Sequence, residues 1–305
     1  MGKFLVAGIA QRETIVKVEK IPIEYAHVTV KPNTIFTSTG GDAYNESLAL
    51  KSLGNSVDFM TMIGSEESMD FINPPGCEVR LVTDYVLPRL RNTPAAVVLY
   101  DNSRKQQIYE DIKDIGDTAY DQNLFRERAE RAEMLVLSNA NFCRPLIGIG
   151  KELRKPVAVN IREYRKEKVR YNEDFLKAAD ILYVSDDNLI DEPFDFVKAL
   201  AARYRPEIII LGQGASGLIL YDKNKNIIAH YNPVKTNEVV NTVGAGNALF
   251  SCFLHFYNIT GDSVFAVKNA MLFASYKIGF VGTSNGFMTE AQINQWRNLI
   301  WRDGR

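Results

Sequence analysis

Short apolar runs alternate with stretches of helical periodicity along most of this chain. Several of the runs are continuous in Val, Ile and Leu, as expected of strands that are covered on both faces. The candidate strands are Phe4–Ile9, Ala95–Tyr100, Met134–Leu137, Val157–Val159, Ile181–Val184 and Ile208–Leu211, and helical patterns between them include Tyr44–Leu53, Asp121–Ala132 and Pro193–Tyr204. This alternation predicts an α/β fold in which helices flank a mostly parallel central sheet.

Two stretches break the alternation. Residues 14–30 mix β-forming residues with Lys and Glu, and residues 91–109 join an apolar run to a polar turn. Both patterns are typical of half-exposed strands and predict a small β-sheet that projects from the main body as a lid. We therefore expect a main α/β domain of residues 1–12, 31–88 and 111–305 and a lid of residues 13–30 and 89–110.

The composition is that of an ordinary folded protein. The chain has 305 residues, 46% of them hydrophobic, and its 36 Lys and Arg against 37 Asp and Glu give a net charge of −1. This balance provides no large field to attract nucleic acid or an anionic membrane, so we expect neither partner. No apolar run approaches the ~18 residues of a membrane span. A small-molecule or protein partner is favoured instead.

The cysteines and histidines are too scattered to define a site. Cys77, Cys143 and Cys252 are odd in number and far apart, which favours a reducing compartment and a cytoplasmic location. The three histidines do not have the spacing of zinc ligands. The basic run at residues 162–170 is interpreted as a solvated face rather than an anion site.

The segment from Gly212 to Gly217 has the spacing GxGxxG and follows a candidate strand. A dinucleotide site would require a helix next, whose N-terminus binds the pyrophosphate. A second apolar run, beginning at Leu218, follows instead. A tight glycine turn between two strands is therefore favoured over a nicotinamide-dependent enzyme, which failure to bind NAD would exclude.

A stronger motif is Asn241-Thr-Val-Gly-Ala-Gly-Asn247. The apolar residues that follow have the spacing of a helix buried along one stripe, so Gly244, Ala245 and Gly246 form its entry. Free backbone amides and the helix dipole make such an entry an anion site. A glycine turn before a core helix is an equally good interpretation of the spacing alone.

This motif resembles the D-T-x-G-A-G-D signature of the ribokinase-like (PfkB) carbohydrate kinases. A second segment, from Gly40-Gly41-Asp42-Ala43-Tyr44-Asn45 to Leu53-Gly54, is similar to the sugar-binding G-G-x-x-x-N helix of that family. Weaker similarities are Ile63-Gly64-Ser65-Glu66, Asn160-Ile161-Arg162 and the Gly214–Gly217 hairpin. The resemblance implies a ribokinase-like three-layer α/β sandwich with a β lid, and transfer of the γ-phosphoryl group of ATP to a sugar hydroxyl.

The resemblance also implies roles for individual residues. Substrate binding falls to Glu13, Gly40, Gly41 and Asn45, nucleotide binding to Gly212, Gly214, Gly217 and Thr242, and the anion hole to Gly244, Ala245 and Gly246. Asn247 occupies the position of the general base. ATP is the expected co-substrate and Mg²⁺ the expected metal. Lids of this family often pair across a dimer, so a homodimer is a further expectation.

Several family carboxylates are missing from the chain. Asn247 and Asn241 replace the two aspartates of the main motif, Ala158 replaces another, and Ser185-Asp186-Asp187-Asn188 replaces an N-x-x-E element that organises magnesium. An amide does not accept a proton at pH 7, and loss of a general base typically costs about 10²- to 10⁴-fold in rate. Asp186 and Asp187 are candidate substitutes near the metal.

Two functional hypotheses follow from the resemblance. The first is a working ATP-dependent kinase for a sugar or sugar-like substrate, because the sugar motif and the anion hole are retained. The second is a protein of the same fold that binds sugar or nucleotide with little turnover, as a sensor or regulatory partner, because the changes cluster at the base and metal positions. The sequence does not name the sugar.

Overall fold

A nine-stranded sheet forms the centre of the molecule. The computed structural model describes residues 1–103 and 105–301, and only the backbone of residue 163; residue 104 of the predicted lid and residues 302–305 of the predicted main body lie outside the described residues. The strand order is β13-β12-β11-β10-β9-β8-β1-β4-β5. The strands are β1 (Lys3–Ala7), β4 (Ser56–Gly64), β5 (Val86–Leu90), β8 (Met134–Ser138), β9 (Val157–Glu163), β10 (Ile181–Ser185), β11 (Ile208–Gly212), β12 (Leu218–Asp222) and β13 (Ile227–Tyr231). All neighbours from β5 to β11 are parallel, and β12 and β13 are antiparallel additions at one edge.

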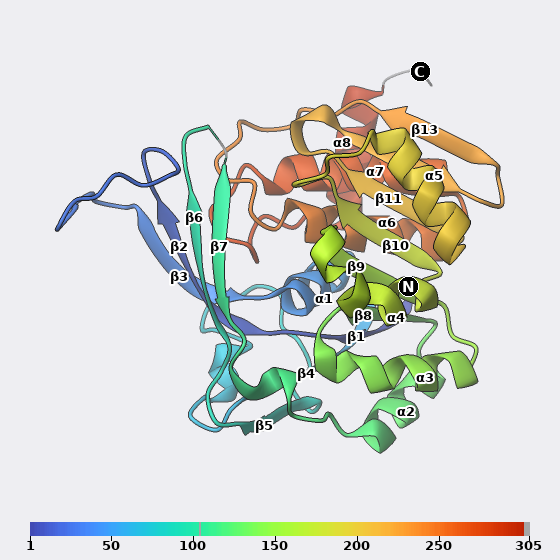
Figure 1. The fold of residues 1–305 in the computed structure, drawn as a ribbon, viewed down its shortest axis with the longest axis horizontal. Helices are drawn as coiled ribbons and strands as arrows, with labels where there is room; N and C mark the ends of the chain where they lie inside the picture. The colour runs from blue at the N-terminus through green and yellow to red at the C-terminus, as the bar shows by residue number, and fades with distance from the viewer. Residues whose placement is uncertain (104, 302–305) are drawn as a thin grey trace.

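Helices cover both faces of this sheet, as the sequence predicts (Figure 1). One face carries α1 (Asp42–Ser52), α6 (Ala245–Thr260), α7 (Ser263–Lys277) and α8 (Glu290–Ile300), and the other carries α2 (Gln122–Arg131), α3 (Arg144–Glu152), α4 (Val169–Ala178) and α5 (Pro193–Tyr204). Successive side chains of β1 alternate between the two cores: Phe4 and Val6 join the first, and Leu5 and Ala7 join the second. The apolar runs are continuous because both faces are buried.

Strand β4, next to the edge strand β5 of the large sheet, is absent from the sequence prediction. Two polar residues, Asp58 and Thr61, interrupt its apolar run. In the structure, Asp58 forms an ion pair with Arg128 of α2 (2.9 Å). The Thr61 hydroxyl accepts a hydrogen bond from the Ala10 amide (3.3 Å). These long-range partners satisfy the polar groups, which allows the strand to lie in the interior.

A second, four-stranded sheet projects from the main body, at the left of Figure 1. Its order is β3-β2-β6-β7, and its strands are β2 (Gln11–Lys17), β3 (Ile35–Gly40), β6 (Ala95–Tyr100) and β7 (Gln106–Asp111). We call it the small sheet. Unlike the predicted lid, it includes β3, whereas residues 18–34 form turns and irregular chain and β5 belongs to the large sheet. Its inner face packs Ile15, Val98 and Tyr100 around Val243.

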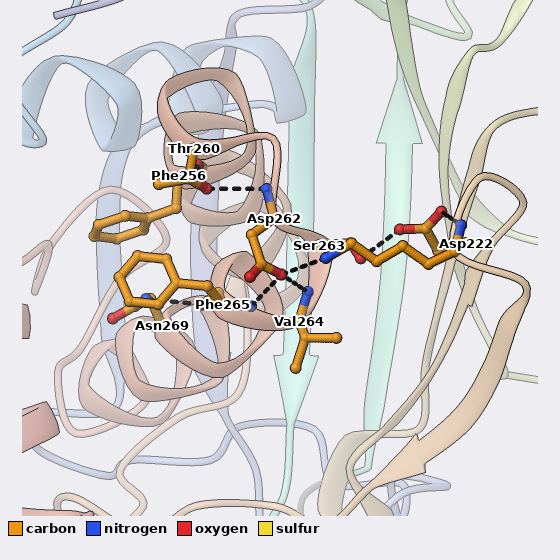
Figure 2. Close-up of polar contacts among 9 residues, drawn as sticks. Asp222, Phe256, Thr260, Asp262, Ser263, Val264, Phe265 and Asn269 are labelled. Carbon is orange, nitrogen blue, oxygen red and sulfur yellow. Dashed lines mark hydrogen bonds and ion pairs between the residues drawn. The ribbon is translucent and has the colours of Figure 1, made fainter. Parts of the chain in front are cut away.

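The connection between α6 and α7 is fixed by a group of polar contacts (Figure 2). The Asp262 carboxylate caps α7 by accepting hydrogen bonds from the amides of Val264 (3.0 Å) and Phe265 (3.2 Å). The Ser263 hydroxyl donates to the buried carboxylate of Asp222 at the end of β12 (2.5 Å). The start of α7 is therefore anchored to the antiparallel edge of the sheet.

The structure describes both the state of the cysteines and the character of the helices. Cys77, Cys143 and Cys252 are all free thiols. Within residues 1–103 and 105–301, none of the helices combines the length and the apolar character needed to cross a membrane.

Candidate active site

The predicted helix entry is present at the start of α6. Gly244 is the N-cap, with φ +79°, and a Cβ there would lie 3.0 Å from the Thr283 carbonyl oxygen, so a larger residue would be both strained and crowded. The Asn241 side chain accepts a hydrogen bond from the Val243 amide (2.6 Å) and shapes the preceding loop. The first turn of α6 lies beside β10, since a Cβ on Gly246 would be 2.7 Å from the Tyr183 hydroxyl. The Ala245 amide donates to the Thr242 carbonyl (3.2 Å), and the other free amides of a helix start suit an anion.

The predicted sugar residues lie where β2 and β3 lead into α1. The Glu13 carboxylate lies directly over Gly40, because a Cβ on that glycine would be 1.9 Å from Glu13 Oε2. Glu13 is 3% exposed; burial raises the pKa of its carboxyl group, while a hydrogen bond from the Thr283 hydroxyl (2.9 Å) lowers it. Gly41 is the N-cap of α1, and Asn45 lies one turn further along the helix.

Asn45 carries an unsatisfied polar atom. Its side chain is 3% exposed, and its Oδ1 atom has no hydrogen-bond partner among the described residues. A buried acceptor without a partner costs about 1–3 kcal/mol. A ligand hydroxyl that donates to Asn45 would remove this cost.

Asn160, in the middle of β9, joins the two motifs. Its side-chain nitrogen donates to Glu46 Oε1 of α1 (2.8 Å) and to Asn247 Oδ1 of α6 (3.1 Å). Its own oxygen accepts from the Arg162 amide (2.8 Å). The Asn247 side chain is a neutral amide that can both donate and accept hydrogen bonds but does not take up a proton at pH 7. The base position therefore presents an amide in place of a carboxylate.

The carboxyl group of Glu46 is buried beside this bridge. Glu46 is 1% exposed, and burial raises its pKa well above the ordinary value, with the neighbouring carboxyl of Asp42 raising it further. Burial also raises the pKa of Asp42, against the opposing effect of Arg162. Arg162 reaches across to form an ion pair with Glu110 of β7. The first residue of the basic run thus contacts the small sheet, contrary to the expected solvated face.

Two of the predicted nucleotide residues, Gly212 and Thr242, lie near the start of α6, and Gly214 and Gly217 belong to the turn after β11. A single turn at Gly214–Ser216 joins β11 to the antiparallel β12, which confirms the glycine turn and excludes the helix that a Rossmann site would need. The Tyr183 hydroxyl lies between the two glycine motifs, since Cβ atoms on Gly212 and Gly246 would be 2.6 and 2.7 Å from it. Thr242 accepts a hydrogen bond from the side chain of Gln106 in β7.

Two carboxylates follow β10 next to the glycine turn. The Ser185 hydroxyl donates to Asp187 (2.9 Å), and the Asp186 amide donates to the Gly212 carbonyl (2.9 Å). Burial raises the pKa of Asp186, and the charge of Asp187 raises it further. A cation would relieve both effects. In the part of the chain that the structure describes, no cluster of three or more His, Cys, Asp and Glu residues is arranged to hold a metal.

Sequence reasoning missed several polar residues of this region. Glu46, Thr283 and Lys277 are buried, although nothing in their local patterns distinguishes them from surface residues. Their one signal is position: Glu46 lies within the sugar motif, and Lys277 ends a helix that is otherwise buried over most of its length. The contacts that bury them come from segments far away in the sequence.

The fold is that of an α/β protein with a mostly parallel sheet and a second, small sheet. Comparison with known proteins identifies its family. The model of the pfkB family of carbohydrate kinases matches residues 1–290, so the chain belongs to this family. Deoxyribokinase from Salmonella typhi is 32% identical over 91 residues, which are 30% of this chain and 29% of that relative. The chain therefore matches less than a third of the length of this curated relative.

Solved structures give the same fold over nearly the full length. A microbiome-derived acarbose kinase superposes with a TM-score of 0.83 at 21% identity, covering 96% of this chain and 98% of the other. Arabidopsis thaliana ribokinase, complexed with ribose and ATP, gives a TM-score of 0.75 at 18% identity and covers 96% and 98%. The fold is ribokinase-like, as the sequence motifs imply.

Proposed function

We propose that this protein is an ATP-dependent kinase that transfers the γ-phosphoryl group to a hydroxyl of a sugar or sugar-like substrate. The observation that carries the proposal is the Asn160 bridge, because one amide group hydrogen-bonds both to the helix of the sugar motif and to the first turn of α6. A substrate held by the first motif would therefore lie next to the amides of the second. Membership of the family and the ribose and ATP of the Arabidopsis relative support the same reaction.

In this proposal, each motif has one task. Glu13, Gly40, Gly41 and Asn45 bind the sugar hydroxyls, and Gly212, Gly214, Gly217 and Thr242 border the nucleotide. The Gly244-Ala245-Gly246 turn stabilises the charge on the transferring phosphoryl group through the amides of its two glycines, since the Ala245 amide donates to the Thr242 carbonyl. Such stabilisation is the main task of the protein in a loose transition state. The substrate oxygen bonds to the γ-phosphorus while the bond to the β-phosphate oxygen breaks, which releases ADP.

Asn247 leaves the hydroxyl proton without a carboxylate acceptor at the usual position. Its amide would hold the substrate oxygen by a hydrogen bond. The proton then passes to water or to the phosphoryl oxygens of the product, at a lower rate than with a positioned base. Positioning and the anion hole supply the remaining catalysis.

The residues that suit magnesium are Asp186 and Asp187. Two carboxylates lie beside the glycine turn, and Mg²⁺ prefers carboxylate and water oxygens as ligands. A cation there would oppose the burial and the Asp187 charge that raise the pKa of Asp186. They would hold the ion through its water molecules and the nucleotide phosphates. The ion would neutralise charge on the phosphates.

A second candidate function is a binding protein with little turnover. The observation that favours it is that the base position holds the neutral amide of Asn247, which is fixed by a hydrogen bond from Asn160. Such a protein would bind sugar or nucleotide and report it to a partner. It would retain the substrate-binding residues but catalyse little phosphoryl transfer.

A substrate screen distinguishes the two functions. The folded protein is incubated with Mg-ATP and a panel of sugars, polyols and nucleosides, and ADP and phosphorylated product are measured. A phosphorylated product supports the kinase. Ligand binding in calorimetry without any product, from a protein shown to be folded, would support the binding protein and contradict the kinase.

We also propose that the protein forms a homodimer through the small sheet. Its outward face exposes Ile35 (64%), Val97 (39%) and Tyr109 (58%). The first two lie on strands paired to β2, at positions that share one face of the sheet. Exposed apolar residues gathered on one face are typical of interaction surfaces. A second copy of the small sheet would cover them.

A further inference from the structure

Lys277 is a buried cation that belongs to neither motif. It is the last residue of α7 and is 0% exposed. Its Nζ atom donates hydrogen bonds to the Val243 carbonyl (2.7 Å) and to the Gly282 carbonyl (2.5 Å). The ammonium group therefore joins the loop that enters α6 to the loop that leaves α7.

Placing an ammonium group in the interior is costly, and lysines are rarely buried completely. Burial lowers the pKa of Lys277 to about 8, although the carboxylate of Glu13 acts to raise it. A methionine would fill similar space at no electrostatic cost. The lysine is therefore better explained by what its charge holds in place than by packing.

The ammonium group of Lys277 fixes the loop that enters α6. A Cβ on Gly244 would lie 3.4 Å from Lys277 Cε and 3.0 Å from the Thr283 carbonyl oxygen, so the two loops touch at the N-cap. The Val243 carbonyl, which directly precedes that glycine, is oriented by the ammonium group. The residue after Gly282 is Thr283, whose hydroxyl donates to Glu13. One short loop thus contacts both the cation and the carboxylate of the predicted sugar site.

We propose that Lys277 is a positioning residue that acts as a tethered cation: it binds the carbonyl groups of Val243 and Gly282 and so holds the amides at the start of α6 in place for phosphoryl transfer. Backbone carbonyl oxygens are ligands that bind monovalent cations such as K⁺. An ammonium group on a side chain provides the same charge without binding from solution. The expected effect on catalysis rests on the proposed kinase function, whereas the expected effect on the structure of the α6 entry does not.

The structural consequence is tested without any assay of activity. In Lys277→Met, which removes the charge and keeps the volume, we expect backbone amides of residues 241–250 to exchange hydrogen at least about tenfold faster than in the wild type. Residues 144–152 of α3, on the other side of the large sheet, should be unchanged. Lys177→Met is the matched control, because Lys177 lies in the last turn of α4 and is exposed. Unchanged exchange in a folded Lys277→Met protein would overturn the proposal.

Chemical rescue tests the charge itself. Lys277→Ala leaves a space lined by the two carbonyls, and added ammonium or potassium chloride should slow the exchange of residues 241–250 toward the wild-type rate. Sodium sulfate at equal ionic strength serves as the salt control. Equal protection by both kinds of salt would show general stabilisation and overturn the tethered-cation role.

With a phosphorylated substrate identified, the catalytic consequence is measured. We expect Lys277→Met to lower kcat on the order of 100-fold, the effect of losing one donor of an anion hole, with a small change in the KM of the sugar. Ammonium should restore kcat in Lys277→Ala. If the wild type phosphorylates nothing, the proposed function fails while the exchange experiment still decides the role of Lys277. A normal kcat in Lys277→Met would overturn the catalytic role alone.

The wild type gives a test that needs no variant. Glu13 is the charged group that acts on Lys277, and it is itself influenced by Arg162 and Glu110. As pH rises through about 8, the folded protein loses the ammonium charge, so kcat should fall. Because the pKa is lower in the folded than in the unfolded chain, the Lys277 contribution to the free energy of unfolding rises over the same range. A loss of activity that coincides with unfolding of the protein would contradict the proposal.

Discussion

Asn247 is the residue at which the chain departs most from its family. It stands where the family motif has an aspartate, and its amide accepts a hydrogen bond from Asn160 (3.1 Å). In Asn247→Asp, the Asn160 amide would donate to a carboxylate instead of an amide oxygen. We expect kcat to rise at least about tenfold, because a proton acceptor is restored.

The measurement is steady-state phosphorylation of whichever substrate the screen identifies. Asn247→Ala is the control, since it removes the amide without adding an acceptor, and should show no gain. A folded Asn247→Asp protein with an unchanged rate would mean that restoring the base is not sufficient and that the metal site is deficient as well.

Glu46 makes the stability of the protein depend on pH. Burial raises the pKa of its carboxyl group in the folded chain, so the folded state keeps a proton that the unfolded state releases. The free energy of unfolding therefore falls as pH rises from the ordinary glutamate pKa of about 4.3 toward the raised value. Glu46→Gln keeps an oxygen for Asn160 and removes this ionisation.

Urea unfolding at a series of pH values between 4 and 8 measures the effect. The difference in free energy of unfolding between Glu46→Gln and the wild type should increase with pH in favour of the variant. Glu152→Gln, at an exposed ion pair on α3, is the control. Parallel curves for Glu46→Gln and the wild type would contradict the prediction.

At the scale of elements, the Asp262 carboxylate caps the start of α7. Asp262→Ala removes the acceptor for two helix amides and should lower the free energy of unfolding by about 1 kcal/mol. Asp262→Asn keeps a capping oxygen and loses only the ion pair with Lys225, so it should be close to the wild type. Chemical denaturation compares the three proteins. Equal losses in both variants would assign the effect to the ion pair.

At the scale of the whole molecule, the exposed face of the small sheet predicts association. We expect the wild type to have about twice the chain mass of 34.4 kDa in light scattering. Introducing charge with Ile35→Lys and Val97→Lys should return it to a single chain, because like charges would face each other across the interface. Ile259→Lys, on α6 and also exposed, is the control. A wild type of 34.4 kDa would contradict the dimer.

Strand β3 and the residues that join the two motifs show where prediction from the sequence ends. The continuous apolar runs and the entry to α6 are recognisable because their signals lie within a few neighbouring residues. Ile35–Gly40 is a short segment that pairs with β2. A long irregular stretch separates the two strands in the sequence, so the segment itself does not specify the register of the pair. Arg162 appears in a basic run typical of a surface, and its pairing with Glu110 depends on where β7 lies.

The sequence by itself determined the alternation of strands and helices, the glycine turn after β11 and the helix that begins beyond Gly244, because backbone sterics and hydrophobic periodicity act locally. Only the tertiary structure decided that Asn160 bridges Glu46 and Asn247, from which it is separated by 114 and 87 positions, and that Lys277 reaches Val243. These contacts exist because α1 packs against α6, the start of α6 packs against β9, and the end of α7 meets the loop that enters α6. This packing between distant segments buries the polar groups, and no local pattern encodes it.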